Sequence, residues 1–77
     1  MPISQDLLQE MNLLAQFDLH SMQQGIKVHS DAAPEIVAAA RRLFDKGLID
    51  QADGGYLTSL GLDAAEHVQN VLQILRG

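Results

Sequence analysis

Three histidines are the side chains of this 77-residue sequence best suited to acid–base chemistry. Nucleophilic catalysis requires a nucleophile beside a base that a third group orients. However, His20, His29 and His67 are scattered along the sequence, and no serine or threonine lies in a recognisable nucleophile turn. We therefore expect a protein that is not an enzyme, needs no cofactor and has no small-molecule substrate.

The closest spacing that suits a metal ion is Asp63, Glu66 and His67, because Asp63 and His67 are one helical turn apart. Two ligands are too few for a metal site, and a solvated polar helix face explains this spacing better. The sequence contains no cysteine, which excludes disulfides and thiolate ligands. We therefore predict no metal site.

Three of the five cationic residues, Arg41, Arg42 and Lys46, fall in one short segment. If this segment is a helix, the three cations lie on its outward side together with one glutamate and two alanines. The candidate binding face therefore consists of Glu35, Ala38, Ala39, Arg41, Arg42 and Lys46. These cations suit DNA phosphates or base edges. Alternatively, the small alanines admit a partner helix, and Arg42 and Lys46 pair with its acidic groups. The net charge of −5 favours the protein partner.

A helix ending near Lys46 is predicted to carry this face. Pro34 suits its first turn, Ser30 or Asp31 can cap it, and Gly47 suits the left-handed position after its end. The opposite side of the helix is apolar over an arc of about 120° and is predicted to face the core. This side contains Ile36, Val37, Ala40, Leu43 and Phe44.

A hairpin is predicted next, since Asp53-Gly54 favours a two-residue type I′ loop between Leu48–Gln51 and Gly55–Thr58. The alternating segment Gly25–His29 is typical of a short strand and can add to this hairpin. Thr58 then caps the last helix, which we predict from about Ser59 to Leu75.

The first helix is predicted to begin after Ser4, with Leu13 and Phe17 giving it apolar surface on more than one side. Residues 18–24 have two interpretations. Asp18 caps a short helical turn that continues to Gln24, or the whole segment is a loop. The predicted core draws on all three helices and the hairpin. Its members are Leu7, Met11, Leu14, Ile36, Ala40, Leu43, Phe44, Ile49, Leu57 and Leu60.

The last helix is roughly 25 Å long at 1.5 Å per residue, which is longer than a core of this size covers. Two arrangements stay open: the helix packs across the first helix, or it forms a homodimer. The predicted dimer face consists of Leu62, Val68, Leu72, Ile74 and Leu75.

A family resemblance follows from Leu43, the Lys46–Ile49 run, the Asp53-Gly54 hairpin and Leu57-Thr58 with Gly61. Together these resemble the end of a winged helix-turn-helix domain, in which the recognition helix runs into the wing and then the next helix. The whole sequence also resembles a small family of bacterial conserved hypothetical proteins. The resemblance implies one winged-helix-like domain over residues 1–77, mainly α with a small antiparallel hairpin and a long C-terminal helix.

Two functions are compatible with these observations. The favoured one is a non-catalytic regulatory module that contacts a second copy or another protein, and the alternative is a DNA-binding transcriptional regulator of the winged helix-turn-helix type. The sequence has no secretory signal and no apolar stretch that could span a bilayer, so we expect a cytoplasmic protein without a membrane partner.

Overall fold

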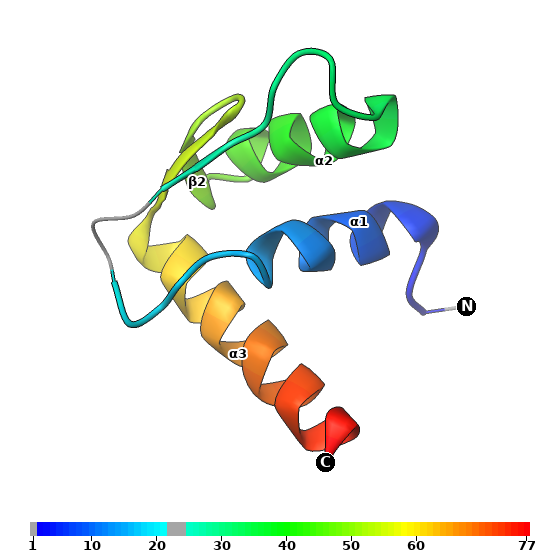
Figure 1. The fold of residues 1–77 in the computed structure, drawn as a ribbon, viewed down its shortest axis with the longest axis vertical. Helices are drawn as coiled ribbons and strands as arrows, with labels where there is room; N and C mark the ends of the chain where they lie inside the picture. Colours follow the sequence, from blue (N-terminus) through cyan, green and yellow to red (C-terminus); the bar gives the residue numbers. More distant parts are fainter. Residues whose placement is uncertain (1, 22–24) are drawn as a thin grey trace.

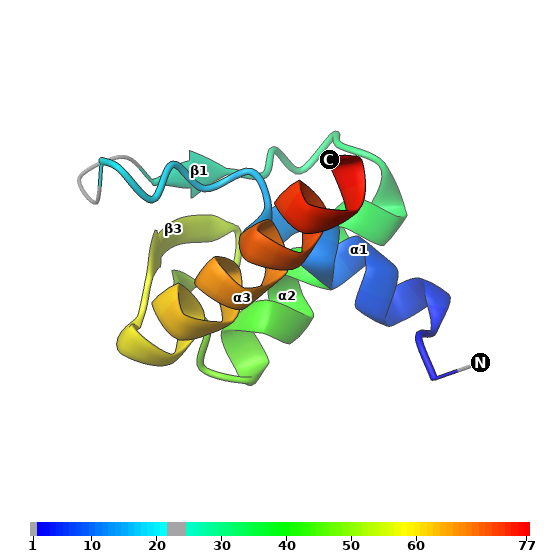
Figure 2. The same cartoon turned by 90° about the horizontal axis from the view of Figure 1, so that it is seen from below.

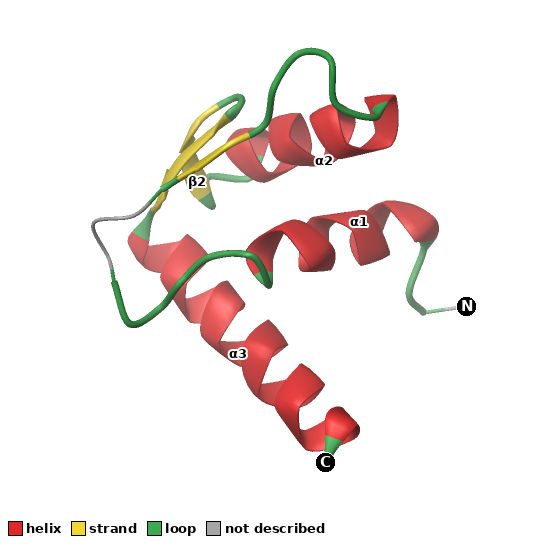
Figure 3. Ribbon diagram, in the orientation of Figure 1, coloured by secondary structure: helices red, strands yellow, loops and turns green. Residues whose placement is uncertain are grey.

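The computed structural model describes residues 2–21 and 25–77. Three helices pack together beside a three-stranded antiparallel sheet with the strand order β1-β3-β2 (Figure 1, Figure 3). The predicted fold class, α+β with a long C-terminal helix, is confirmed. The elements in chain order are α1 (Gln5–Leu14), β1 (Ile26–Lys27), α2 (Pro34–Asp45), β2 (Ile49–Gln51), β3 (Gly54–Leu57) and α3 (Ser59–Arg76).

Two hydroxyl groups cap the first and last helices as predicted. Ser4 Oγ accepts a hydrogen bond from the backbone N–H of Leu7 at 3.1 Å, at the start of α1. Thr58 Oγ1 accepts one from the N–H of Gly61 at 3.0 Å, and it also donates to the carbonyl of Gly47 at 2.6 Å. Thr58 therefore ties the start of α3 to the chain just after α2.

The bounds of α2 are close to the prediction. The helix begins at Pro34, and Gly47 follows its end with a φ of +80°. The expected cap by Ser30 or Asp31 is wrong, because Ala33 occupies the N-cap position and no side chain accepts a hydrogen bond there. Residues 28–33 connect β1 to α2 through turns, so no second helix precedes α2 in this connection.

The hairpin forms, but its turn lies one residue earlier than predicted. Gln51 pairs with Gly54, which leaves Ala52 and Asp53 as the turn. The positive φ angles fall on Gly54 and Gly55, and no described non-glycine residue has a positive φ, so Asp53 does not adopt the predicted type I′ conformation. The register of β2 and β3 then shifts, which is typical of a bulge.

The strand predicted over Gly25–His29 is shorter than expected, since only Ile26–Lys27 is assigned to β1. Val28 extends the pairing by donating its N–H to the carbonyl of Asp53 at 2.7 Å. Ile26 and Val28 contribute to the core while Lys27 and His29 are exposed, as the alternation predicts. The predicted turn at Asp18 begins with a hydrogen bond from the N–H of His20, whereas its continuation to Gln24 lies outside the described residues.

The core lies where α1 packs against α2 and α3 and where the sheet meets the end of α2 and the start of α3 (Figure 1, Figure 2). Several predicted core residues are buried there, namely Leu14, Ala40, Leu43 and Ile49, while Met11, Ile36 and Leu57 are half-buried. The structure adds Leu13, Phe17, Val28, Ala39 and Ala65.

Three predicted core residues are exposed instead. Leu7 is exposed because it lies in the first turn of α1, whose residues are all exposed, whereas the buried residues Glu10, Leu13 and Leu14 belong to the later turns. Leu60 is exposed because α3 approaches the core through Gly61, where a Cβ atom would lie 1.8 Å from the carbonyl oxygen of Leu48. Phe44 is 38% exposed because α2 is rotated about its axis toward Ala39, which also exposes Val37.

Two adjacent alanine substitutions test this rotation. We expect Leu43→Ala to lower the free energy of unfolding by about 2–5 kcal/mol, since Leu43 is 1% exposed and its loss leaves a cavity. Phe44→Ala should cost clearly less, although phenylalanine is the larger side chain, because part of its ring already contacts water. Urea unfolding of both variants measures the difference. A larger loss for Phe44→Ala would contradict the observed orientation of α2.

Candidate interaction surfaces

A buried carboxylate on α1 organises one side of α2. Glu10 is only 5% exposed, and its Oε2 atom accepts a hydrogen bond from Nε of Arg42 at 2.8 Å. Its other oxygen pairs with the ammonium group of Lys46. Arg42 also donates from Nη2 to the carbonyl oxygen of Asp6 at 3.2 Å. The first and second helices are therefore joined by charge-assisted hydrogen bonds as well as by apolar packing.

Opposing effects set the pKa of Glu10. Burial of the carboxyl group raises its pKa, while hydrogen bonds and charge attraction from Lys46 and Arg42 lower it by more in total. The net pKa lies below the ordinary value for glutamate. Glu10 is therefore ionised at neutral pH, and its charge is balanced by two cations from one helix.

Contacts within the chain occupy half of the six-residue face that the sequence predicts for binding DNA or a partner helix. Ala39 is fully buried, and Arg42 and Lys46 bind Glu10. The sequence, in one interpretation, predicted that this face packs against an acidic partner helix. Arg42 and Lys46 do pair with an acidic residue of a helix, but that helix is α1 of the same chain. Glu35, Ala38 and Arg41 are the members of the predicted face that stay exposed without a contact to Glu10.

Glu10 was absent from the candidates that the sequence suggests. The sequence nevertheless indicates that Glu10 faces the core. Leu13, Leu14 and Phe17 follow it at spacings of three, four and seven residues, which places them on its side of a helix. A charged residue within an apolar stripe predicts a partner of opposite charge, since burial of an unpaired charge is costly.

Most other cations also pair within the chain. Lys27 on β1 forms an ion pair with Asp53 in the hairpin turn, and this side-chain hydrogen bond lowers the pKa of Asp53. Arg41 donates from Nε to Asp45 at 3.3 Å. Within residues 2–21 and 25–77, Arg76 is the one lysine or arginine without an ion pair. The hairpin itself presents Asp50 and Asp53 and no cation.

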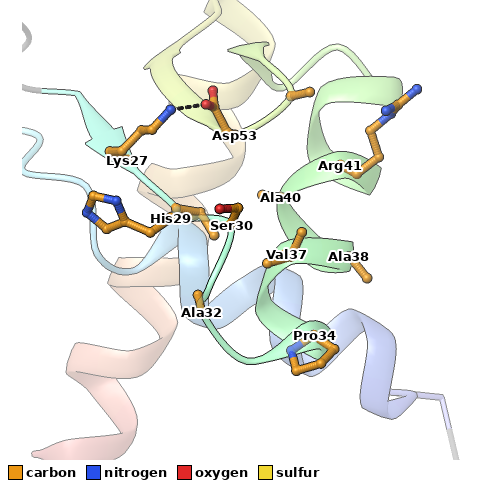
Figure 4. Close-up of a pocket in the computed structure, with 12 residues that line it drawn as sticks. Lys27, His29, Ser30, Ala32, Pro34, Val37, Ala38, Ala40, Arg41 and Asp53 are labelled. Carbon is orange, nitrogen blue, oxygen red and sulfur yellow. Dashed lines mark hydrogen bonds and ion pairs between the residues drawn. The ribbon is translucent and has the colours of Figure 1, made fainter.

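The exposed side of α2 lines a groove, which we call the α2 groove (Figure 4). The segment after β1 forms its other wall and the hairpin turn closes one end, around a volume of about 720 Å³. Its apolar lining comes mostly from small side chains, and Lys27, His29, Ser30, Arg41 and Asp53 are its polar members. The apolar lining residues are Val28, Ala32, Pro34, Val37, Ala38, Ala40 and Ala52.

The predicted dimer face on α3 divides into two parts. Leu62, Val68 and Leu72 are half-buried, and Val68 packs against the core of its own chain. Ile74 and Leu75 are 69% and 78% exposed, and the neighbouring Val71 is exposed as well. We call Val71, Ile74 and Leu75 the α3 strip. It lies on the half of α3 that extends away from the sheet (Figure 1).

The three histidines lie at two separate places on the described surface, with His29 at the α2 groove. His20, Glu66 and His67 line a hollow between α3 and the chain before β1. His67 Nδ1 lies 2.7 Å from the carbonyl oxygen of Asp63, and this contact, with the nearby Asp63 carboxylate, raises the pKa of His67. The described residues hold no group of three or more histidine, aspartate or glutamate side chains suited to a metal ion.

Neutralising Glu10 tests its role in stability. Because its pKa is lower in the folded chain, Glu10 stabilises the fold above the ordinary glutamate pKa, and this contribution is lost as the pH falls through the lowered pKa. We expect Glu10→Gln to cost about 1–3 kcal/mol at neutral pH, because Arg42 and Lys46 lose their shared charge partner. The loss should disappear in acid, where the wild-type carboxyl is also neutral.

Urea unfolding at neutral and acidic pH measures this difference. Glu66→Gln is the matched control, because Glu66 is exposed and forms no ion pair among the described residues. Its effect should be near zero throughout. A cost for Glu10→Gln that stays constant with pH would show that the charge of Glu10 does not contribute.

Comparison with known proteins adds a family but no activity. No helix in the described part of the chain combines the length and the apolar character required to cross a membrane. No curated protein and no solved structure matches the chain. Residues 1–76 match a family of unknown function, DUF5669, so that all six helices and strands lie within the match. The chain therefore belongs to this family of unknown function.

Proposed function

We propose that this protein is a non-catalytic, winged-helix-type interaction module that contacts another protein chain through the α3 strip. The observation that carries this proposal is the exposure of Val71, Ile74 and Leu75 together on one side of a helix. Single exposed apolar residues are normal on protein surfaces, whereas a contiguous apolar group marks a contact site more often.

The position of the strip supports a partner from outside the chain. Residues near the start of α3, such as Gly61 and Ala65, are buried against the rest of the molecule, while its last turns are exposed. Gln69 anchors the middle of the helix by donating to the carbonyl oxygens of Leu14 and Phe17, at 3.2 and 2.8 Å. The orientation of the following turns is thus fixed by the fold, which lowers the entropic cost of presenting the strip.

DNA binding by α2 has weaker support. Binding to DNA gains affinity when cations replace counterions along the phosphate backbone. Arg42 and Lys46 are held by Glu10, and Arg41 pairs with Asp45, so α2 offers few free positive charges. The acidic residues of the hairpin add repulsion where a wing would meet a phosphate.

Charge insertion into the strip tests the interaction. Val71→Glu should weaken self-association, or binding of a co-purified protein, by at least about tenfold, because the carboxylate loses water at the contact. Asn70→Glu is the matched control, since Asn70 is an exposed neighbour outside the strip. Sedimentation velocity and pull-down assays measure the two effects. Equal behaviour of both variants would contradict the proposal.

A titration with duplex DNA tests the alternative directly. We expect amide NMR signals of α2 to stay unchanged at about 50 mM salt, a condition that favours binding through phosphate contacts. Arg41→Ala should then have no effect on DNA retention. Shifts confined to α2 and the hairpin, lost in Arg41→Ala, would instead support a DNA-binding regulator.

A further inference from the structure

Helix α1 has two flanks of opposite character beside its buried side. One flank consists of uncharged polar residues at helical spacing, namely Gln5, Gln9 and Asn12. The other flank is apolar, and we call its members Leu7, Leu8 and Met11 the α1 row. Leu7 and Leu8 are exposed and Met11 is half-buried. The core of the same chain therefore leaves most of the α1 row uncovered, although the opposite flank shows that polar residues suit an exposed position on this helix.

The α1 row and the α3 strip lie on helix ends that diverge from each other. The two helices are joined where Gln69 donates hydrogen bonds to the carbonyl oxygens of Leu14 and Phe17. From this contact α1 leads back toward the N-terminus and α3 leads on toward the C-terminus, in different directions (Figure 1, Figure 2). The strip is therefore carried away from the α1 row of its own chain, and both surfaces stay largely exposed.

The accessible surface of the chain is larger than its mass predicts. A compact monomer of 8.4 kDa exposes about 4,600 Å². This chain exposes 5264 Å², which is about 650 Å² more. A stable protein–protein interface buries about 600–1,000 Å² on each partner. The extra surface is therefore large enough for one such contact.

The charges of the two helix ends are complementary. Residues 68–76 of α3 contain one charged residue, Arg76, which forms no ion pair among the described residues. In contrast, α1 contains Asp6 and Glu10 and no lysine or arginine. Glu10 is buried, but the side chain of Asp6 is 73% exposed and lies as far as 3.8 Å from Arg42. Asp6 directly precedes the α1 row, so the row of a second copy offers a carboxylate to the cation at the end of α3.

We propose that two copies of this chain associate about a two-fold axis, with the α1 row of each copy against the α3 strip of the other. The proposal rests on the proposed function and names its partner, a second copy. The contact is isologous, because both copies use the same surface and each pairing occurs twice. Burial of the exposed aliphatic side chains of both helices drives the association.

Two charge substitutions in the full chain test this pairing. Leu8→Lys places a cation in the α1 row, and Leu75→Glu places a carboxylate in the α3 strip. Leu8→Lys also makes the net charge of −5 less negative, so weaker association cannot come from stronger repulsion between copies. Asn12→Lys on the polar flank and Asn70→Glu outside the strip are the matched controls. Unfolding curves check the fold, and Leu8→Gln takes the place of Leu8→Lys if the lysine variant does not fold.

We expect wild type to show a monomer–dimer equilibrium in sedimentation equilibrium. Leu8→Lys and Leu75→Glu alone should each weaken it by at least about tenfold, because each places a charge twice in an apolar contact. An equimolar mixture of the two variants should associate again. In the mixed dimer the new lysine meets the new carboxylate, and the second pairing is unchanged. Both controls should behave as wild type.

Three outcomes overturn the two-fold contact. If Leu75→Glu weakens association and Leu8→Lys does not, the strip binds a surface other than the α1 row, and the proposed function survives. If both variants weaken association but their mixture stays monomeric, the row and the strip do not meet. If wild type is monomeric at about 1 mM, no dimer forms, and the proposed function then depends on a co-purified protein that Val71→Glu releases. If Leu75→Glu and Val71→Glu change no association at all, the proposed function fails as well.

Discussion

The carboxylate of Glu10 is the constraint on which the arrangement of the helices depends. It is buried between α1 and α2, where an unpaired charge would be strongly destabilising, and so Arg42 and Lys46 must both turn toward it. That requirement sets the rotation of α2 about its axis. Ala39 enters the core, Phe44 moves to its edge, and the opposite side of the helix becomes the wall of a groove.

Several features encoded by neighbouring residues were predictable from the sequence, although the cap of α2 and the exact position of the hairpin turn were not. Features that depend on distant pairs were not predictable. Caps at Ser4 and Thr58, the helix start at Pro34 and the stop at Gly47 depend on local chemistry. The rotation of α2 depends on a hydrogen bond between residues 32 positions apart. A helical wheel sorts residues only by polarity. It therefore predicted that Arg42 faces water and Phe44 faces the core, whereas Arg42 binds the buried Glu10 and Phe44 is exposed.

The candidate surfaces were also predictable only where they are formed by one continuous stretch of sequence. The sequence suggested an aliphatic contact on the last helix, and Ile74 and Leu75 are exposed there. Val68 is instead half-buried against the core, which reflects tertiary packing that periodicity alone does not reveal. The α2 groove combines residues from β1, the next turn, α2 and the hairpin, so no single stretch of sequence contains its pattern. Intramolecular pairing of the cations on α2 shifts the functional interpretation from DNA toward protein contacts.

The pKa of Glu10 is the most direct measure of this constraint. NMR titration of its side-chain carboxyl carbon in the folded protein reports the charge state of that one group. We expect a midpoint below that of a glutamate in an unstructured peptide, because Lys46 and Arg42 stabilise the carboxylate by more than burial disfavours it. A midpoint at or above the peptide value would show that these cations do not hold Glu10, and that the orientation of α2 has another cause.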